Sequence, residues 1–503
     1  MNGNFYSALA GSIDAARERV LLETEEAVTY SGADVARESA RFAHFLLASG
    51  AKRGDRIAVQ VEKSPANLFL YLGCLRAGLV YLPLNTAYQR GELAYFIGDA
   101  EPAIVVCKPQ SADLVRELVA GNVQVFTLDE NGAGSAADGA SMQSGEFETA
   151  QSGADDLAVI LYTSGTTGRS KGAMVTHRNL ESNARTLVDL WRFSARDVLL
   201  HALPIFHIHG LFVANHCSLL AGAKMLWHRK FDAKAALRDL PRATVMMGVP
   251  TFYTRLLADP AFGRDACRNM RLFISGSAPL LLETFTEFEQ RTGQRILERY
   301  GMSESGMNCS NPLDGERRGG SVGFPLPGVA LRIAGDADQA LPDGQIGGIQ
   351  IRGPNVFAGY WRMPEKTREE FTADGFFRTG DVGTIDADGY VSIVGRAKDL
   401  IISGGFNVYP KEIELALDAL PGVVESAVIG VPHADFGEAV TAVVVTKKGA
   451  GLEAAAVIAE MKKNFANYKV PKQVYFVDDL PRNAMGKVQK AMLRERYGKH
   501  DSR

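Results

Sequence analysis

The sequence contains no apolar run long enough to cross a bilayer. Its longest apolar stretches, such as residues 68–75, fall far short of the ~20 residues that a membrane-spanning helix needs. The first residues of the chain lack a basic region followed by an apolar one, so no secretory signal is expected. We therefore predict a protein that works without a membrane partner.

Cysteine is scarce and scattered. The five cysteines are Cys74, Cys107, Cys217, Cys267 and Cys309, and no two of them form a C-x-x-C pair. This spacing predicts neither a disulfide framework nor a zinc site. We expect small, buried, reduced thiols in a cytoplasmic protein.

Neither sign of charge is in excess. Lysine and arginine together number 55 and aspartate and glutamate 58, which gives a formal net charge of −3. This balance offers no global electrostatic basis for binding nucleic acid or an acidic membrane. Hydrophobic residues make up 46% and charged residues 22%, as in a globular protein, and 503 residues favour two or more domains.

Short apolar runs alternate with helical stretches over the first four hundred residues or so. Apolar strands separated by helices predict parallel sheets covered on both faces, and thus an α/β fold. Residues 131–156, rich in Gly, Ala and Ser, are predicted to be a flexible surface connection. After about residue 322 the pattern becomes β-rich, and the last hundred residues resemble a small α+β unit. We predict an N-terminal domain of residues 1–396 and a C-terminal domain of residues 397–503.

The segment most informative about chemistry follows a predicted strand at residues 157–162. It is a loop of glycines, hydroxyl residues and two cations: Thr163, Ser164, Gly165, Thr166, Thr167, Gly168, Arg169, Ser170, Lys171 and Gly172. Backbone N–H groups, hydroxyls and positive charge together suit a polyphosphate. The P-loop pattern G-x-x-x-x-G-K-[ST] is not met, and composition alone leaves a surface turn as an alternative.

Six motifs, in order along the chain, resemble those of the adenylate-forming superfamily, which includes acyl-CoA synthetases, luciferases and peptide-synthetase adenylation domains. They occupy residues 162–174, 275–279, 300–304, 379–381, 395–399 and 481–487. The resemblance implies a large N-terminal domain of layered sheets and helices with a small mobile α+β C-terminal lid. It also implies a two-step reaction. A carboxylate attacks the α-phosphate of MgATP to give an acyl-adenylate and diphosphate, and the thiol of coenzyme A then displaces AMP.

The resemblance implies roles for individual residues. Lys487 would steady the charge that develops between carboxylate and α-phosphate, and Arg396 would reach the ribose or phosphate. Glu304 and Thr163 would bind Mg²⁺, a hard cation that prefers oxygen ligands. The predicted ATP-binding residues are Thr163, Ser164, Gly165, Thr166, Thr167, Gly168, Lys171, Ser277, Ala278, Pro279, Glu298, Arg299, Tyr300, Gly301, Met302, Ser303, Asp381, Arg396 and Lys487.

Two further roles follow from the same resemblance. Lys398 matches the hinge about which the lid rotates between the half-reactions, and Gly404, Gly405 and Phe406 would face the coenzyme A thiol. Acetylation of Lys487 would remove its charge, so an acetyltransferase is a speculative partner.

The identity of the acid rests on fewer residues. His207, Ile208, Arg255, Arg299 and Met307 are the predicted acyl-pocket residues. A buried unpaired guanidinium is costly, so two arginines there favour a substrate with a second carboxylate, although structural ion pairs remain an alternative. Residues 201–214, 248–256, 298–308 and 404–414 resemble those of bacterial malonyl-CoA synthetases, which implies malonate or methylmalonate as substrate.

Three alternatives stay open at this point. The acid could be a medium-chain fatty or aryl carboxylate. The chain could also be a non-catalytic nucleotide-binding protein on the same scaffold, which we would expect to lack Lys487 or Glu304. The weakest alternative is an adenylating partner of a carrier protein.

Overall fold

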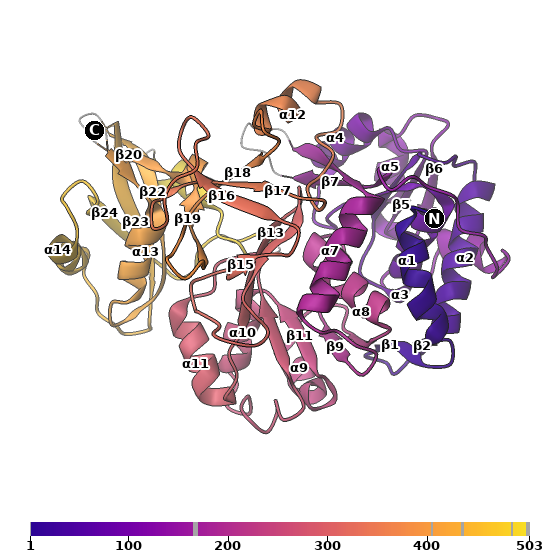
Figure 1. Ribbon diagram of the computed structural model, residues 1–503, viewed down its shortest axis with the longest axis horizontal. Helices are drawn as coiled ribbons and strands as arrows, with labels where there is room; N and C mark the ends of the chain where they lie inside the picture. Colours follow the sequence, from indigo (N-terminus) through magenta and orange to yellow (C-terminus); the bar gives the residue numbers. More distant parts are fainter. Residues whose placement is uncertain (1, 164–169, 404–405, 434–436, 484–485, 499–503) are drawn as a thin grey trace. The chain divides into compact units, whose positions relative to one another are not determined.

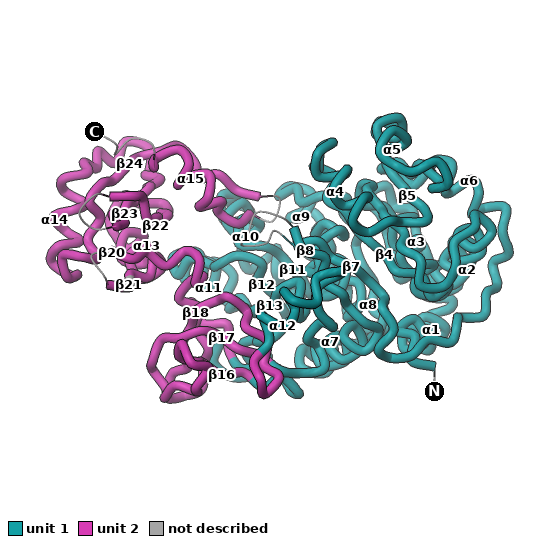
Figure 2. Tube along the Cα trace, turned by 90° about the horizontal axis from the view of Figure 1, so that it is seen from above, with its two compact units in different colours: residues 1–319, 324–330, 352–371 teal, residues 320–323, 331–351, 372–503 magenta. Residues whose placement is uncertain are grey.

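The computed structural model describes residues 2–163, 170–403, 406–433, 437–483 and 486–498. Contacts between residues divide the chain into two compact units, shown in different colours in Figure 2. The first comprises Met1–Gly319, Phe324–Ala330 and Arg352–Phe371, and the second comprises Gly320–Gly323, Leu331–Ile351 and Thr372–Arg503. Because the chain passes between the units more than once, this division differs from a single cut at residues 396/397, and that joint stays a prediction.

The first unit contains a six-stranded and a nine-stranded sheet. The six-stranded sheet has the order β6-β5-β3-β4-β7-β8 and is parallel except for β8. Its strands are β3 (Arg56–Gln60), β4 (Val80–Pro83), β5 (Ile104–Cys107), β6 (Gln124–Thr127), β7 (Leu157–Thr163) and β8 (Lys171–Thr176). The strand pair β7–β8 encloses the predicted phosphate loop.

The nine-stranded sheet has the order β15-β14-β13-β12-β11-β9-β10-β1-β2, with parallel pairing from β13 to β1. Its strands are β1 (Val20–Thr24), β2 (Thr29–Ser31), β9 (Val198–His201), β10 (Lys224–Trp227), β11 (Val245–Gly248), β12 (Leu272–Ser275), β13 (Leu297–Met302), β14 (Gly306–Ser310) and β15 (Phe324–Pro325). The carboxyl ends of the parallel strands meet at one edge, where ligands usually bind in such sheets.

Helices alternate along the chain with the strands of both sheets (Figure 1). They are α1 (Phe5–Ala15), α2 (Gly32–Ala48), α3 (Pro65–Ala77), α4 (Arg90–Ala100), η1 (Pro109–Ser111), α5 (Ala112–Leu118), α6 (Ser135–Ser141), α7 (His177–Leu190), the π-helix η2 (His209–Ala214), α8 (Asn215–Ala221), α9 (Ala233–Asp239), η3 (Leu240–Arg242), α10 (Pro250–Leu257), α11 (Leu282–Thr292) and α12 (Pro364–Glu370). Local sequence explains their ends. The Ser64 side chain caps α3 at its start, Pro65 occupies its first turn, and Gly78 ends it with φ of 68°.

The prediction of a flexible connection over residues 131–156 is wrong. The segment contains α6, which packs against α2 and buries Ala136 and Ala140. A Cβ atom added to Gly139 would lie 2.4 Å from the Phe45 ring. Small residues that suggest flexibility therefore allow α6 to approach its neighbour closely.

The second unit contains a four-stranded and a five-stranded sheet. The first is the meander β16 (Ala330–Ala334), β17 (Gly347–Arg352), β18 (Phe377–Ile385) and β19 (Val391–Arg396), followed by η4 (Ala397–Asp399). The other sheet and its helices comprise β20 (Ile401–Ser403), β21 (Phe406–Val408), α13 (Pro410–Asp418), β22 (Val423–His433), β23 (Gly437–Thr446), α14 (Ala454–Asn464), β24 (Gln473–Val477) and α15 (Lys490–Tyr497). Apolar clusters lie on both faces of this sheet, one containing residues of α13 and α14 and the other residues of α15.

The α/β fold class, with a large N-terminal sheet region and a smaller C-terminal one, is confirmed. The strand predicted at residues 157–162 appears as β7 (Leu157–Thr163). None of the helices in the described ranges combines the length and the apolar character needed to cross a bilayer.

Candidate adenylation site

The predicted site residues form one group in each of the two units. In the first unit, Thr163 ends β7 and lies opposite Lys171 of β8 in the strand register. The Thr163 hydroxyl donates to Oε1 of Glu304 at 3.2 Å, and the hydroxyl of Tyr360 donates to the same oxygen at 3.2 Å. Glu304 is buried. The two residues predicted to bind Mg²⁺ are thus in direct contact.

The chemistry of this pair fits Mg²⁺. A carboxylate and a hydroxyl are oxygen donors, and Mg²⁺ is usually held by one or two protein ligands together with phosphate oxygens and water. In the part of the chain that the structure describes, no group of three or more His, Cys, Asp or Glu side chains could hold a metal by itself. A metal at Glu304 would therefore need the oxygens of a nucleotide.

The rest of the phosphate loop is only partly described. Ser164, Gly165, Thr166, Thr167 and Gly168 lie outside the described residues. Lys171 is described and buried, with its Nζ 3.3 Å from Oε1 of Glu370 and 4.1 Å from the centroid of the Tyr360 ring. Burial and the neighbouring carboxylates Glu304 and Glu370 raise the pKa of Tyr360, so this hydroxyl stays a donor.

A second group gathers at the ends of β12 and β13. Arg299, on β13, is 4% exposed, and neither its Nε nor its Nη2 atom has a hydrogen-bond partner among the described residues. Burial lowers its pKa to about 9. A Cβ atom added to Gly276 would lie 2.4 Å from the guanidinium carbon, so the absence of a side chain at 276 is what leaves room for Arg299.

His209 adjoins this group from the first turn of η2. Its Nδ1 lies 3.3 Å from the hydroxyl of Ser277, and its Nε2 finds no partner within the described ranges. Burial and the Arg299 cation lower the pKa of His209 well below its usual range, so the imidazole is neutral. Ser277 has φ of 71°, a left-handed conformation that non-glycine residues seldom adopt.

The other predicted nucleotide residues of this unit surround the same edge of the sheet. Ala278 and Pro279 follow β12 and are partly or fully exposed; Glu298, Arg299, Tyr300, Gly301 and Met302 lie on β13, and Ser303 and Glu304 follow it. The structure therefore brings the 275–279 and 300–304 motifs together on neighbouring strands.

The predicted acyl-pocket residues differ in how far their side chains are exposed to solvent. Ile208 and Met307 are buried, and a Cβ atom at Gly301 would lie 2.4 Å from the Met307 methyl carbon. His207 accepts from the backbone N–H of His209 at 3.3 Å. Arg255, by contrast, lies exposed on α10, whereas Arg299 is buried. The two arginines that are both predicted to lie in the acyl pocket thus differ: one is exposed to solvent and the other is buried.

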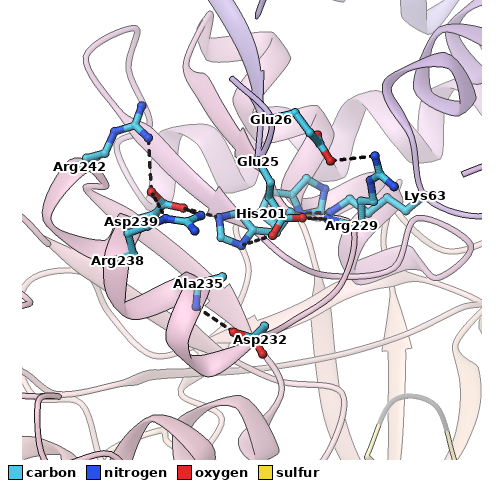
Figure 3. A network of polar contacts seen from close by, with 11 residues as sticks. Glu25, Glu26, Lys63, His201, Arg229, Asp232, Ala235, Arg238, Asp239 and Arg242 are labelled. Atoms are coloured by element: carbon cyan, nitrogen blue, oxygen red, sulfur yellow. Dashed lines mark hydrogen bonds and ion pairs between the residues drawn. The ribbon is translucent and has the colours of Figure 1, made fainter. Parts of the chain in front are cut away.

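Lys63 and His201 belong to a network of polar contacts (Figure 3). Lys63, between β3 and α3, donates from Nζ to the carbonyl oxygen of His201 at 2.7 Å, and its ammonium lies 4.5 Å from the Trp227 ring centroid. Burial lowers the pKa of Lys63 well below its usual range, an effect that Glu25 opposes. Because His201 ends β9, this contact links the loop after β3 to the strand that precedes His207 and Ile208, two of the predicted acyl-pocket residues.

In the second unit, Asp381 and Arg396 lie opposite each other on β18 and β19. Arg396 Nε contacts Asp381 Oδ1 at 2.8 Å, and Asp381 is buried. Beyond β19, Asp399 accepts from Arg494 at 2.7 Å. The motifs at 379–381 and 395–399 are thus joined by strand pairing.

Lys487 belongs to this cluster. Burial lowers its pKa to about 8, and the cations Arg396 and Lys398 contribute in the same direction, while Asp381 and Asp399 oppose them. The backbone around it is held by Asn483, whose side chain accepts from the Lys487 N–H at 3.0 Å. The ammonium predicted to act in catalysis thus titrates closer to neutral pH than an exposed lysine does.

The remaining predicted residues of this unit are Lys398, Gly404, Gly405 and Phe406. Lys398 lies in η4, where burial lowers its pKa and Arg396 adds to the effect. Gly404 and Gly405 lie outside the described residues. Phe406 is 56% exposed and stacks on Tyr468 with ring centroids 4.5 Å apart.

Comparison with known proteins identifies the family. The family model described as AMP-binding enzyme matches residues 12–361, and that of the AMP-binding enzyme C-terminal domain matches residues 412–487. The chain belongs to the AMP-binding enzyme family. This AMP-binding enzyme is 36% identical to a feruloyl-CoA synthase of Amycolatopsis over 94% of each chain. It is also 36% identical to a malonate–CoA ligase of Arabidopsis thaliana over 89% of this chain and 78% of that one.

The AMP-binding enzyme also resembles solved structures. The crystal structure of ATP-bound MatB from Rhodopseudomonas palustris matches it with a TM-score of 0.97 and 56% identity over 99% of both chains. These matches confirm the predicted superfamily and an AMP-forming acid–CoA ligase as the class of enzyme.

Sequence reasoning missed several residues of the site. Tyr360 and Glu370 fall outside the six motifs, and only the fold brings them to Glu304 and Lys171. His209 could have been found, because it is the second histidine of the pair at 207 and 209.

Proposed function

We propose that this AMP-binding enzyme joins malonate, and methylmalonate as a second acid, to coenzyme A, with ATP cleaved to AMP and diphosphate. The observation that carries the choice of acid is Arg299, a buried guanidinium whose Nε and Nη2 have no hydrogen-bond partner in the described part of the chain. Leaving such a cation unpaired is costly, and a substrate carboxylate would satisfy it with charge-assisted hydrogen bonds. The likeness to malonate–CoA ligases supports the same choice.

The first half-reaction brings two anions together. One carboxylate of the acid attacks the α-phosphorus of ATP, the bond to the β,γ-diphosphate breaks, and diphosphate leaves. Glu304 and Thr163 would hold Mg²⁺, which supplies positive charge to the phosphates. Arg299 would hold the second carboxylate away from the reacting one, and neutral His209 beside it offers a hydrogen-bonding ring without adding charge.

The second unit would supply the remaining groups. Asp381 would accept hydrogen bonds from the ribose hydroxyls, and Arg396, paired with Asp381, would approach the nucleotide. Lys487 would donate to the oxygens that gain charge as the anhydride forms. In the second half-reaction the sulfur of coenzyme A bonds to the acyl carbon, the bond to AMP breaks, and Gly404, Gly405 and Phe406 would face the thiol.

The predicted partners are small molecules: a carboxylic acid, ATP and coenzyme A. We propose a cytoplasmic location, which the five buried cysteine thiols support. An acetyltransferase acting on Lys487 is a further proposal, because acetylation would remove the charge that the first half-reaction needs.

Diphosphate release over a panel of acids tests the choice of substrate. Malonate is expected to give the highest kcat/KM, with methylmalonate lower because the bulky Ile208 and Met307 side chains are predicted to form the wall of the acyl pocket. Acetate, octanoate and ferulate lack a second carboxylate and are expected to be poorer by about 10²-fold or more. Strong release with ferulate or octanoate and none with malonate would contradict the proposal.

The hinge is tested by proline at residue 398. Proline fixes φ, so Lys398→Pro is expected to block rotation of the C-terminal domain between the half-reactions. ATP–diphosphate exchange with malonate should stay within a few-fold of the wild type, whereas malonyl-CoA formation should fall by about 10²-fold or more. Lys398→Ala, which keeps φ free, is the control. Equal loss of both activities in the proline variant would argue against a hinge at this position.

A further inference from the structure

The side chain of His201, at the end of β9, forms a hydrogen bond with that of Asn215, the first residue of α8. His201 Nε2 lies 3.0 Å from Asn215 Oδ1, and both side chains are almost fully buried. Because the amide oxygen of Asn215 can only accept, the His201 ring carries its proton on Nε2. The hydrogen bond joins residues that are 14 positions apart and so closes residues 202–214 into a loop.

Other contacts hold both ends of this loop. The carbonyl oxygen of His201 accepts from Nζ of Lys63 at 2.7 Å and from the backbone N–H of His228 at 3.1 Å. Asn215 begins a helix that packs against α1 and α7. The hydrogen bond between the two side chains therefore connects two packed elements and sets the distance between the ends of residues 202–214.

The loop contains the predicted acyl-pocket residues His207 and Ile208 and the neighbouring His209. It is folded tightly, since a Cβ atom added to Gly210 would lie 2.2 Å from the carbonyl oxygen of Pro204. Its last 6 residues form the π-helix η2, a rare conformation that is frequent at functional sites. A change in the distance between the ends of the loop should therefore displace these side chains.

Stability alone does not account for a polar pair at this place. Among the described residues, Nδ1 of His201 and Nδ2 of Asn215 have no hydrogen-bond partner, so each side chain buries an unpaired polar atom. Burial lowers the pKa of His201 well below its usual range, and the Lys63 cation acts in the same direction, so the ring is neutral. Two apolar side chains of similar shape would avoid the unpaired atoms at little cost in stability.

We propose that His201 and Asn215 are positioning residues, whose hydrogen bond holds residues 202–214 in the conformation that binds the acid. They act through the side chains between them and not by contact with the substrate. The inference rests on the acyl-pocket role proposed for His207 and Ile208 and not on the identity of the acid.

Steady-state kinetics of variants at both positions test the proposal, with the acid that the wild type uses best. His201→Met and Asn215→Leu roughly keep the shape of each side chain and remove the hydrogen bond. Each is expected to raise the KM for the acid about tenfold and to leave the KM for ATP within about twofold, because the displaced side chains belong to the acyl pocket. His201→Gln, whose amide nitrogen can donate in place of Nε2, should keep the KM for the acid near the wild-type value.

The double variant with His201→Met and Asn215→Leu separates positioning from stability. Each single variant leaves a buried partner unpaired and should lower the melting temperature, whereas the double variant should recover most of that loss. Its KM for the acid should stay raised, because an apolar contact does not fix the two ends as a hydrogen bond does. A wild-type KM for the acid in the double variant would overturn the proposal.

Tyr81→Phe is the matched control. The Tyr81 hydroxyl donates to Oδ1 of Asn67 at 2.8 Å, in a buried pair that is also 14 residues apart but does not enclose the acyl segment. The variant is expected to lower the melting temperature without changing the KM for the acid. An equal rise of that KM in Tyr81→Phe would show that any loss of stability has this effect, which contradicts a positioning role.

Amide hydrogen exchange of residues 202–214 reports on the loop without any substrate. Exchange should be faster than in the wild type in both single variants and in the double variant, and unchanged in His201→Gln. Unchanged exchange in all variants, or a rise of the KM for ATP equal to that for the acid, would overturn the proposal. A wild-type preference for an acid other than malonate would contradict the proposed function and leave this test intact.

Discussion

Lys487→Met is expected to reduce adenylate formation by about 10²–10³-fold or more, because it removes the ammonium that would meet the developing charge. The measurement is ATP–diphosphate exchange with malonate. Lys463→Met, at a lysine whose side chain is 68% exposed on α14, is the control and should keep full activity. Methionine at 487 should not unfold the protein, because the site lowers the pKa of the lysine and so disfavours its charged form.

The titration of Lys487 should also determine how the adenylation activity of the wild type depends on pH. Burial and the neighbouring Arg396 and Lys398 lower the pKa of Lys487 to about 8, so its charged form prevails below pH 8 and is lost as pH rises above it. The kcat/KM for adenylation should therefore fall about tenfold per pH unit above that value. Lys487→Arg, which stays charged, should lose this alkaline limb even where its activity is lower. An unchanged alkaline limb in Lys487→Arg would contradict the assignment.

Arg299→Met is expected to reduce kcat/KM for malonate by about 10³-fold or more, because a site built to pair with a charged group discriminates strongly against its loss. Methionine roughly preserves the length and removes the buried charge. Activity with a monoacid such as butyrate should be kept or should rise, since an apolar group would replace the guanidinium. The measurement is diphosphate release with each acid at saturating ATP.

The substitution Arg255→Met tests which of the two arginines binds the second carboxylate of the substrate. Arg255 is exposed and lies on α10, so its replacement should cost malonate activity less than that of Arg299 if the buried guanidinium is the main anchor. A larger loss in Arg255→Met would instead favour Arg255 as the residue that holds the second carboxylate. Equal activity of Arg299→Met and the wild type would remove the argument for a dicarboxylic acid.

Much of the fold could be predicted because its signals are local. The helix at 65–77 begins with a serine cap and a proline. Several strands of the two sheets are short apolar runs that end in Gly, Ser or Pro, such as β4, β11 and β12. The prediction for residues 131–156 is wrong because Ala and Gly are typical both of flexible segments and of closely packed helices. Only the neighbour across the contact, the Phe45 ring on α2, distinguishes these two cases.

The site was predictable to the extent that its residues lie in motifs. Glu304, Thr163, Asp381 and Arg396 are predicted from motifs, and the structure places them in two contacting pairs. Tyr360 and Glu370 could not be found, because 56 residues separate Tyr360 from Glu304 and 199 separate Glu370 from Lys171. The different exposure of Arg255 and Arg299 could not be read from the sequence either, since it depends on how α10 and β13 pack against their neighbours in the fold.

The close approach of Gly276 to Arg299 constrains how this enzyme could evolve toward other acids. With the guanidinium carbon only 2.4 Å from where a Cβ would stand, alanine at 276 requires the far end of the Arg299 side chain to shift. Loss of the arginine removes that requirement. The effects of substitutions at the two positions should therefore depend on each other, and alanine at 276 should cost less after a change at 299 than before it.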